Sequence, residues 1–199
     1  MKRGLFVSVA SFLLFTIAGF TQELRNEVSV EGTGFFTKDS TGNGISRTTT
    51  NTGGLEVGYR YHINRWFSAE ANYVFDRNTQ KYFADAGQNR VQADVHGVTA
   101  DVVVNLPLHI GKFSPYALAG GGRLIFHPTG NGVVPGAGTQ AKGAFLYGAG
   151  ADYVLTRHFS LRAEYRGFLN KDPDFGLQSL KTGSWTHTAQ PSAGFVYRF

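Results

Sequence analysis

The feature that most constrains this chain is an alternation of apolar and polar residues with a period of two, which recurs in eight stretches from Glu27 onward. In the clearest stretch, apolar side chains occupy every second position from Phe159 to Tyr165, while Ser160, Arg162 and Glu164 stand between them. A period of two indicates a β-strand with two different faces. The pattern therefore predicts an all-β chain whose strands separate an apolar environment from a polar one.

The spacing of these stretches predicts how the strands are connected. Connections of about three to seven residues alternate with loops of about 14 to 18 residues, which is typical of an up-and-down barrel in an outer membrane. Each stretch is close to the length of about 9 to 11 residues that a tilted strand needs to cross a bilayer. We therefore expect an eight-stranded antiparallel transmembrane β-barrel with short periplasmic turns, long extracellular loops and both termini at the periplasmic end. The expected strands are residues 27–36, 51–62, 66–75, 94–106, 114–126, 143–154, 158–169 and 188–199.

Two turns of three residues, at 63–65 and 155–157, set the expected strand register. Pairing must keep the polar side chains of neighbouring strands on the same face of the sheet, because a slip of one residue moves every side chain to the opposite face. Glycines then stand beside long charged side chains and leave them room in a narrow barrel. The expected pairs are Gly58 with Glu70, Gly150 with Arg162, and Gly148 with Glu164.

The first residues have the pattern of a secretory signal peptide. Lys2 and Arg3 precede an apolar run from Leu5 to Phe20, and small residues follow near its end. We expect residues 1–21 to be a signal peptide with cleavage near 18–22, and residues 22–199 to form one barrel domain. No later run is continuously apolar over the roughly 18 residues that a spanning helix needs, which argues against a helical membrane protein.

Composition narrows the class of protein further. Without Lys2 and Arg3 the chain has 17 basic and 14 acidic residues, and its basic residues stand singly, so the basic patch of a nucleic-acid-binding protein is missing. The absence of cysteine excludes disulfides, thiolate metal sites and a lipid-modified cysteine. The 26 glycines and 14% aromatic residues suit β-structure with many turns.

Alternation alone does not say which face is inside, because a soluble lipocalin-like barrel has the same period with its apolar face inward. Aromatic residues near the strand ends favour an apolar face toward lipid, since they resemble the girdles of membrane barrels. We assign Tyr59, Tyr61, Tyr73, Phe75, Tyr116, Phe126 and Phe195–Phe199 to those girdles, and Gly120, Ala149 and Ala151 to the middle of the same face.

The opposite, charged face then points into the lumen. Six acids and five arginines are expected there, and near-balance suggests that they pair, because an unpaired buried charge is very costly. An eight-stranded barrel is only just wide enough for side chains, so we expect a filled lumen, with a proton or ion path as the alternative. The predicted network comprises Glu31, Glu56, Arg60, Glu70, Asp101, Arg123, Asp152, Arg162, Glu164, Arg166 and Arg198.

Two segments carry a resemblance to a known family. Phe195-Val196-Tyr197-Arg198-Phe199 resembles the C-terminal signal that outer-membrane barrels present to their assembly machinery, with Phe195, Tyr197 and Phe199 as its aromatic residues. Arg157–Tyr165 resembles the seventh strand of the OmpA-like barrel family. The resemblance implies a barrel in the cell outer membrane, contact with outer-membrane lipid and lipopolysaccharide, and handling by the assembly machinery. The chain departs from full OmpA in lacking a periplasmic domain after the barrel, so peptidoglycan anchoring is not expected.

The candidates for chemistry are weak. His158-Phe159-Ser160 resembles the His-x-Ser arrangement of lipid A deacylases, but it adjoins a short periplasmic turn, and Glu164 faces inward with Ser160. The rim histidines His96, His127 and His187 lack the close spacing of converging metal ligands. The run Gly120–Gly122 lies within a strand and lacks the Lys-Ser/Thr of a phosphate loop. We therefore expect no enzyme activity, no metal and no cofactor.

The remaining expectation is a monomeric structural or surface protein whose long loops are mobile and form the interaction surface. The loops are Thr37–Thr50, Asp76–Ala93, His127–Lys142 and Asn170–His187. An alternative is transport of small or hydrophobic solutes through the barrel or a lateral opening, because Pro191 can weaken the last strand or mark a bulge. A third reading is a soluble periplasmic barrel that binds an apolar ligand.

Overall fold

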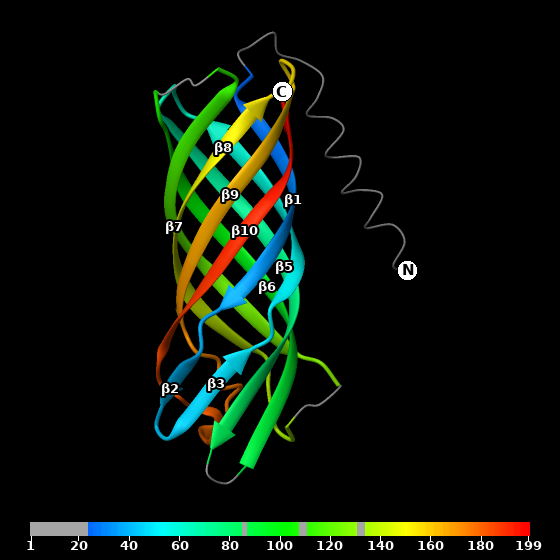
Figure 1. Ribbon diagram of the computed structural model, residues 1–199, viewed down its shortest axis with the longest axis vertical. Coiled ribbons are helices and arrows are strands. Elements are labelled where there is room, and N and C mark those ends of the chain that lie inside the picture. The colour runs from blue at the N-terminus through cyan, green and yellow to red at the C-terminus, as the bar shows by residue number, and fades with distance from the viewer. Residues whose placement is uncertain (1–23, 85–86, 108–110, 131–133) are drawn as a thin grey trace, which may run out of the picture.

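The computed structural model describes residues 24–84, 87–107, 111–130 and 134–199, which form a closed antiparallel barrel (Figure 1). The predicted signal peptide at 1–21 lies outside the described residues. Eight strands make the barrel, and the pairing of the first with the last closes it. They are β1 (Asn26–Thr37), β4 (Thr52–His62), β5 (Phe67–Ala84), β6 (Gly87–Asn105), β7 (Phe113–Pro128), β8 (Gln140–Val154), β9 (Phe159–Lys171) and β10 (Trp185–Arg198). The predicted fold class is confirmed.

The two ends of the barrel differ. The chain end at Phe199 lies at the short-turn end, where the Asn26 N–H donates to its carbonyl. The opposite, long-loop end carries the small hairpin of β2 (Ser40–Gly42) and β3 (Ile45–Thr49), and a single 3₁₀ turn, η1 (Gln178–Leu180). None of the described residues belongs to a helix that is long and apolar enough to cross a membrane.

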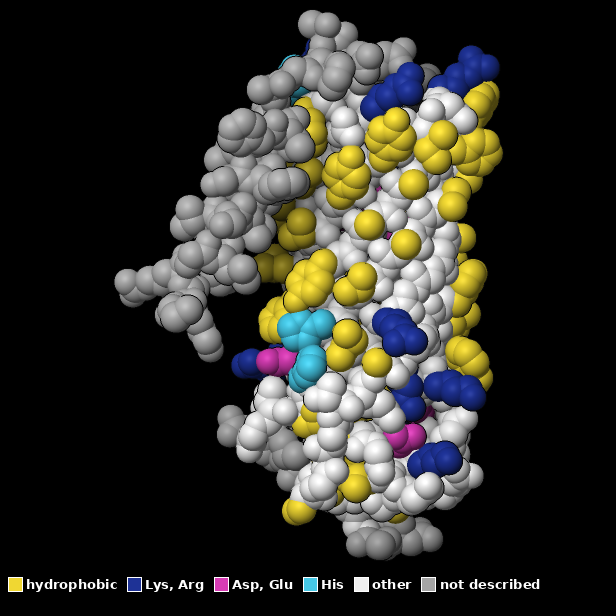
Figure 2. Space-filling view, turned by 180° about the vertical axis from the view of Figure 1, so that it is seen from behind, with side chains coloured by type: hydrophobic (Ala, Val, Ile, Leu, Met, Phe, Trp, Pro, Cys, Tyr) yellow, Lys and Arg dark blue, Asp and Glu magenta, His cyan; other side chains and the backbone are white. Residues whose placement is uncertain are grey.

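Side chains alternate between the lumen and the outer surface. In β9, Ser160, Arg162 and Glu164 are buried inside the barrel, whereas Leu161 and Tyr165 are exposed outside. Apolar side chains cover much of the barrel wall and become sparse toward the long-loop end (Figure 2). An apolar outer surface around a charged interior is the arrangement expected in lipid.

The strand register differs from the predicted one by two residues. Arg60 pairs with Glu70, and Asp152 pairs with Arg162. The cause lies in the turns, each of which is one residue longer than expected, so that β5 begins at Phe67 and β9 at Phe159. The side chain of Asn64 accepts hydrogen bonds from the N–H groups of Trp66 and Phe67 inside the first turn. Thr156 does the same in the turn before β9. The last pairs before the turns are His62 with Ser68 and Val154 with Ser160, a shift of two residues, so the faces are preserved.

The inner and outer faces of β7 were assigned the wrong way round. Tyr116 and Phe126 are buried in the lumen, and Gly120 faces inward against Asp101. Arg123 lies on the outer surface, so it is not part of the lumen network. Both faces of β7 are largely apolar, and alternation therefore gives little information about this strand.

The long loops are more regular than their composition suggested. β5 and β6 continue through most of the predicted loop 76–93 as paired strands, and β3 pairs with the extension of β5. We call the described residues of 38–51, 77–93, 129–139 and 172–184 the hood. Its buried side chains form a second hydrophobic core with those of the adjoining barrel strands: Ile45, Tyr82, Val91, Ala93, Val95, Phe126, Phe175 and Leu180. The expected loop bounds 76–93 are wrong, because these residues continue the paired strands β5 and β6 and their apolar residues help to form this core.

Candidate functional site

The lumen is crossed by three buried arginines, Arg60 on β4 and Arg162 and Arg166 on β9, each at most 2% exposed. Arg166 contacts four acids. Its guanidinium donates to Glu70 at 2.5 Å, to Asp101 at 2.9 Å and to Glu164, and it lies 3.3 Å from Glu56. Charge-assisted hydrogen bonds of this kind fix the geometry of both partners.

Arg60 and Arg162 occupy the half of the lumen nearer the short turns. Arg60 donates to Glu70, its direct partner in the register. Arg162 donates to both oxygens of Asp152, at 2.8 and 3.0 Å, and to Glu27 at 3.0 Å. The ring of Tyr116 lies 4.2 Å from the Arg60 guanidinium. These contacts tie six strands together across the barrel axis: β1, β4, β5, β7, β8 and β9.

Two lumen residues were missed by the sequence interpretation. Glu27 is fully buried and binds Arg162 and Arg198, while His62 lies 2.8 Å away. The inward position of Glu27 could have been predicted, because Glu27 and Glu31 lie four residues apart in β1 and therefore on the same face. Tyr116 donates to Glu164 at 2.5 Å, and its apolar ring gave no sign that it faces inward.

All but two of the predicted network residues are buried in the lumen. Arg198 lies at the short-turn end with its side chain 30% exposed, and Arg123 is outside. The other predicted residues form ion pairs, except Glu31, for which the described residues include no cationic partner within 4 Å. The buried set is Glu31, Glu56, Arg60, Glu70, Asp101, Asp152, Arg162, Glu164 and Arg166.

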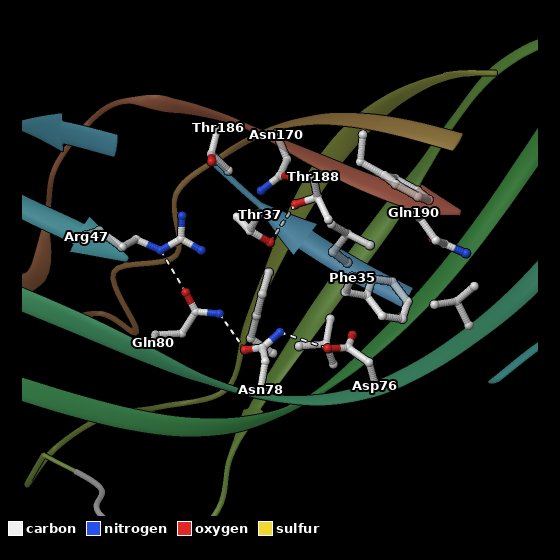
Figure 3. Close-up of a pocket in the computed structure, with 15 residues that line it drawn as sticks. Phe35, Thr37, Arg47, Asp76, Asn78, Gln80, Asn170, Thr186, Thr188 and Gln190 are labelled. Atoms are coloured by element: carbon white, nitrogen blue, oxygen red, sulfur yellow. Dashed lines mark hydrogen bonds between the residues drawn. The ribbon is translucent and has the colours of Figure 1, made fainter. Parts of the chain in front are cut away.

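Between this network and the hood lies a small cavity of about 30 Å³, enough for one or two water molecules (Figure 3). One of its walls is a row of hydrogen-bonded polar side chains on β5. Arg47 donates to Gln80, Gln80 donates to Asn78, and Asn78 donates to Asp76. Phe35 and Phe168 are among its apolar lining residues. The cavity is thus enclosed between the charged plug and the core of the hood.

Polar contacts also hold the hood together. Arg47 donates to the buried Asp172 at 2.7 Å, and the Tyr82 hydroxyl donates to the Pro173 carbonyl at 2.5 Å. Burial raises the pKa of Tyr82, so its hydroxyl remains a donor. For Asp174, partial burial would raise the pKa, but hydrogen bonds from Gln140 and the Gly176 N–H and the nearby Lys142 hold it below its usual value.

Four of the described histidines, His96, His127, His158 and His187, lie on the outer surface or in an exposed turn, whereas His62 adjoins the lumen. His96 and His127 are in ring contact on the outer face, with centroids 5.3 Å apart, and His187 is hydrogen-bonded to the Tyr147 hydroxyl. His158 lies in an exposed turn and donates to the Arg198 carbonyl, whereas Ser160 points into the lumen. The structure does not bring His158 and Ser160 together as a pair.

Pro191 interrupts the pairing of β10 with β1. The register links Thr33 with Ser192 and Phe36 with Ala189, but the two positions between these pairs are unpaired. The register is the same on both sides, so Pro191 causes no bulge. It removes a hydrogen-bond donor from one point of the ladder, because proline has no backbone N–H. The gap adjoins the cavity, whose lining includes Phe35 and Gln190.

The terminal aromatic residues follow the outer face of β10. Phe195 is exposed on that face, and Tyr197 stacks on Phe199 with ring centroids 5.9 Å apart. Tyr197 also contacts Phe159 of β9. These rings form an aromatic cluster on the barrel wall at the short-turn end.

Comparison with known proteins finds a matching family and solved barrels with a similar fold. The family model described as "Outer membrane protein beta-barrel domain" matches residues 7–199. The outer membrane protein OprG from Pseudomonas aeruginosa is 14% identical with a TM-score of 0.63, covering 88% of this chain and 96% of that chain. Neisserial surface protein A is 16% identical, with a TM-score of 0.58 and coverage of 87% and 97%. AlkL, solved in DMPC bilayers, is 15% identical, with a TM-score of 0.55 and 92% coverage of both chains. No curated protein matches the chain.

Proposed function

The chain belongs to the family of outer membrane protein beta-barrel domains, and from that premise we propose that it is a monomeric barrel with a closed lumen, which presents its hood at the cell surface. The observation that carries this proposal is the set of three buried arginines crossing the lumen. Each pairs with acids from several strands, and no open path remains beside side chains of this size in an eight-stranded barrel. A function outside the lumen follows, and we assign it to the hood at the long-loop end.

The charge of the hood and of the adjacent barrel wall favours an anionic partner. Exposed basic side chains there are Lys38, Arg77, Arg90, Arg123, Lys171 and Lys181. Asp39 is the exposed acid among the described residues of the same region, while Asp94 is bound to Arg77. Lipopolysaccharide, with its phosphates at the level of the outer leaflet, is the partner we propose. Less lipopolysaccharide should copurify with the double variant Arg123→Gln, Lys171→Gln than with the wild type, and equal amounts would count against this partner.

Surface presentation can be tested by labelling, because the chain has no cysteine of its own. A cysteine in place of Gln178 in the hood should react with a membrane-impermeant thiol reagent on intact cells. A matched cysteine in place of Arg157, in an exposed short turn, should react only after the outer membrane is permeabilised. Labelling of the Arg157→Cys variant on intact cells, with protection of the Gln178→Cys variant, would reverse the proposed orientation.

The terminal aromatic cluster supports a second part of the proposal, recognition of Phe195, Tyr197 and Phe199 by the outer-membrane assembly machinery. Replacing Phe199 by alanine should lower the amount of folded barrel in the outer membrane while the same chain still folds in detergent. Unchanged membrane levels would remove this role. The detergent control separates recognition from a general loss of stability.

A second candidate function is passage of a small hydrophobic compound from the hood sideways into the membrane. The gap between β1 and β10 at Pro191, next to the cavity, favours it. Replacing Pro191 by alanine restores an N–H donor and should close the gap. If the barrel transports, uptake of a labelled apolar compound rises on expression of the wild type and falls in the Pro191→Ala variant. If the lumen is closed on all sides, expression of the wild type does not raise uptake, and the Pro191→Ala variant does not lower it.

A further inference from the structure

Acidic side chains outnumber basic ones in the lumen. The buried carboxyls belong to Glu27, Glu31, Glu56, Glu70, Asp101, Asp152 and Glu164. The arginines that pair with them are Arg60, Arg162, Arg166 and Arg198. Even if His62 carries a proton beside Glu27, two carboxyls have no cationic counterpart among the described lumen residues. Buried charges without compensation are strongly destabilising, so the carboxyls in excess either hold a proton or are compensated by a further cation.

Glu31 is a buried carboxyl that lacks a cationic partner among the described residues. This side chain is 1% exposed and makes no ion pair with the described residues. In the register, Glu31 stands directly opposite Glu56, which is also fully buried and faces the lumen. Like charges directly opposite each other on neighbouring strands destabilise a sheet. Arg166 lies 3.3 Å from Glu56, and no ion pair with a described cation reaches Glu31.

Oxygen atoms without hydrogen-bond partners gather on the same wall of the lumen. Glu31 accepts from Ser192 through one oxygen only, and Gln190 donates to one oxygen of Glu56. A Cβ on Gly58 would lie 2.6 Å from Ser29 Oγ and 2.4 Å from Asn72 Oδ1. The glycine therefore leaves room for both oxygens beside β4. The unpartnered oxygens on β1, β5 and β10 are Ser29 Oγ, Glu31 Oε1, Thr33 Oγ1, Asn72 Oδ1 and Gln190 Oε1, and Glu56 Oε1 on β4 accepts no hydrogen bond but lies 3.3 Å from Arg166.

We propose that the lumen binds one Ca²⁺ ion between Glu31 and Glu56, with hydroxyl and amide oxygens of the same wall among its ligands. Ca²⁺ takes about six to eight oxygen ligands in flexible geometry and accepts carboxylate, amide and water oxygens together. Mg²⁺ demands a near-ideal octahedron and gives up its waters reluctantly, which suits an irregular wall less well. A divalent ion also supplies two of the positive charges by which the lumen carboxyls exceed the arginines.

The test uses the full barrel refolded from urea into detergent, without lipopolysaccharide, in the presence of either Ca²⁺ or a chelator. Wild type refolded with Ca²⁺ should retain about one ion per chain after gel filtration in chelator-free buffer. Its midpoint for thermal conversion of the folded to the unfolded gel band should exceed that of the chelator-treated sample by about 5 °C or more. Metal content is measured by mass spectrometry.

Variants identify the ligands. Glu31→Gln should retain no Ca²⁺ and show the same midpoint with Ca²⁺ and with chelator. In chelator it should be at least as stable as the wild type, because it removes an uncompensated charge. Glu56→Gln should also lose the ion, and Asp39→Asn, which removes an exposed carboxylate, should keep it. Wild type without bound Ca²⁺ and with one midpoint in both buffers overturns the proposal, and so does a Glu31→Gln variant that still binds the ion. Neither result affects the closed-barrel function.

Discussion

Arg166 is the residue on which the lumen network depends most, because four carboxyls surround its guanidinium. Replacing it by methionine keeps much of the volume and leaves those acids without their shared cation. Removing one partner of a buried ion pair costs about 3–5 kcal/mol, so Arg166→Met should lower the free energy of unfolding by about that amount. Urea unfolding in lipid vesicles measures it. Arg157→Met, in an exposed turn, is the control and should change stability by less than about 0.5 kcal/mol. A loss below about 1 kcal/mol in Arg166→Met would show that the acids do not depend on this arginine.

At the same scale, the sequence predicts inward residues well where the two faces differ in polarity. Arg162, Glu164 and Arg166 alternate with apolar residues, so their face follows from parity alone. Arg123 lies in a strand that is apolar on both faces, and parity could not place it. The pairing partners could not be predicted, because they depend on the length of two turns in which a single side chain, Asn64 or Thr156, accepts the backbone hydrogen bonds.

At the scale of the strand, glycine sets how closely neighbouring strands approach. A Cβ added to Gly148 in β8 would lie 2.2 Å from the Tyr165 carbonyl oxygen, so the backbone would have to shift. Gly148→Ala should destabilise the barrel by about 1–3 kcal/mol through overpacking. Gly143 lies in the same strand, and a Cβ added there would have no atom within 4 Å. Gly143→Ala should therefore be neutral or slightly stabilising in the same urea titration, and equal losses in both variants would argue against this reading of the packing.

The hood should be able to unfold while the barrel stays folded. Phe175 is 1% exposed in the hood core and packs edge-to-face on Phe126, with ring centroids 6.3 Å apart. Phe175→Ala should cost the hood about 3–5 kcal/mol. The barrel below should keep its folded gel migration, while residues 172–184 become sensitive to protease. Gln178→Ala, at an exposed position, should leave protease resistance unchanged. Joint loss of barrel and hood in Phe175→Ala would show that the two cores unfold as one unit.

Acid should loosen the same segment. The pKa of Asp174 is below its usual value, so its charged form stabilises the folded hood at pH values above the ordinary carboxyl pKa, and this contribution is lost as the pH falls through the lowered value. Protease cleavage within 172–184 should therefore increase below about pH 4. Asp174→Asn should show a smaller dependence on pH over that range. An identical dependence in the variant would assign the effect to other groups.

The elements themselves could be predicted only in part from the sequence. All eight barrel strands were found, but β5 and β6 run on beyond the membrane-length segment. The extension of β5 is polar on both faces, and its inward Asn78 and Gln80 bond to one another, so it has no apolar–polar alternation to detect. In β6 the alternation does continue, because the buried Val91, Ala93 and Val95 are separated by Gln92 and Asp94, and the expected loop 76–93 passed over this signal. The burial of Phe175 depends on contacts with residues far away in the chain.

At the scale of the whole molecule, the charged lumen, the cavity and the hood core follow one another along the barrel axis. We propose that the paired charges block passage through the lumen, and the packed side chains of the hood core lie beyond them at the long-loop end. The closed state therefore depends on two separate barriers, the charged lumen and the hood core. Weakening the hood alone should not open the barrel.

The central claim is that the lumen is closed, and single-channel recording in planar bilayers tests it most directly. Wild-type barrel, verified as folded by its gel migration, should give no stable conductance steps in concentrated KCl at neutral pH. The Phe175→Ala variant should be equally silent, because the arginine network remains. Reproducible open steps of uniform size from folded wild-type protein would contradict a closed lumen.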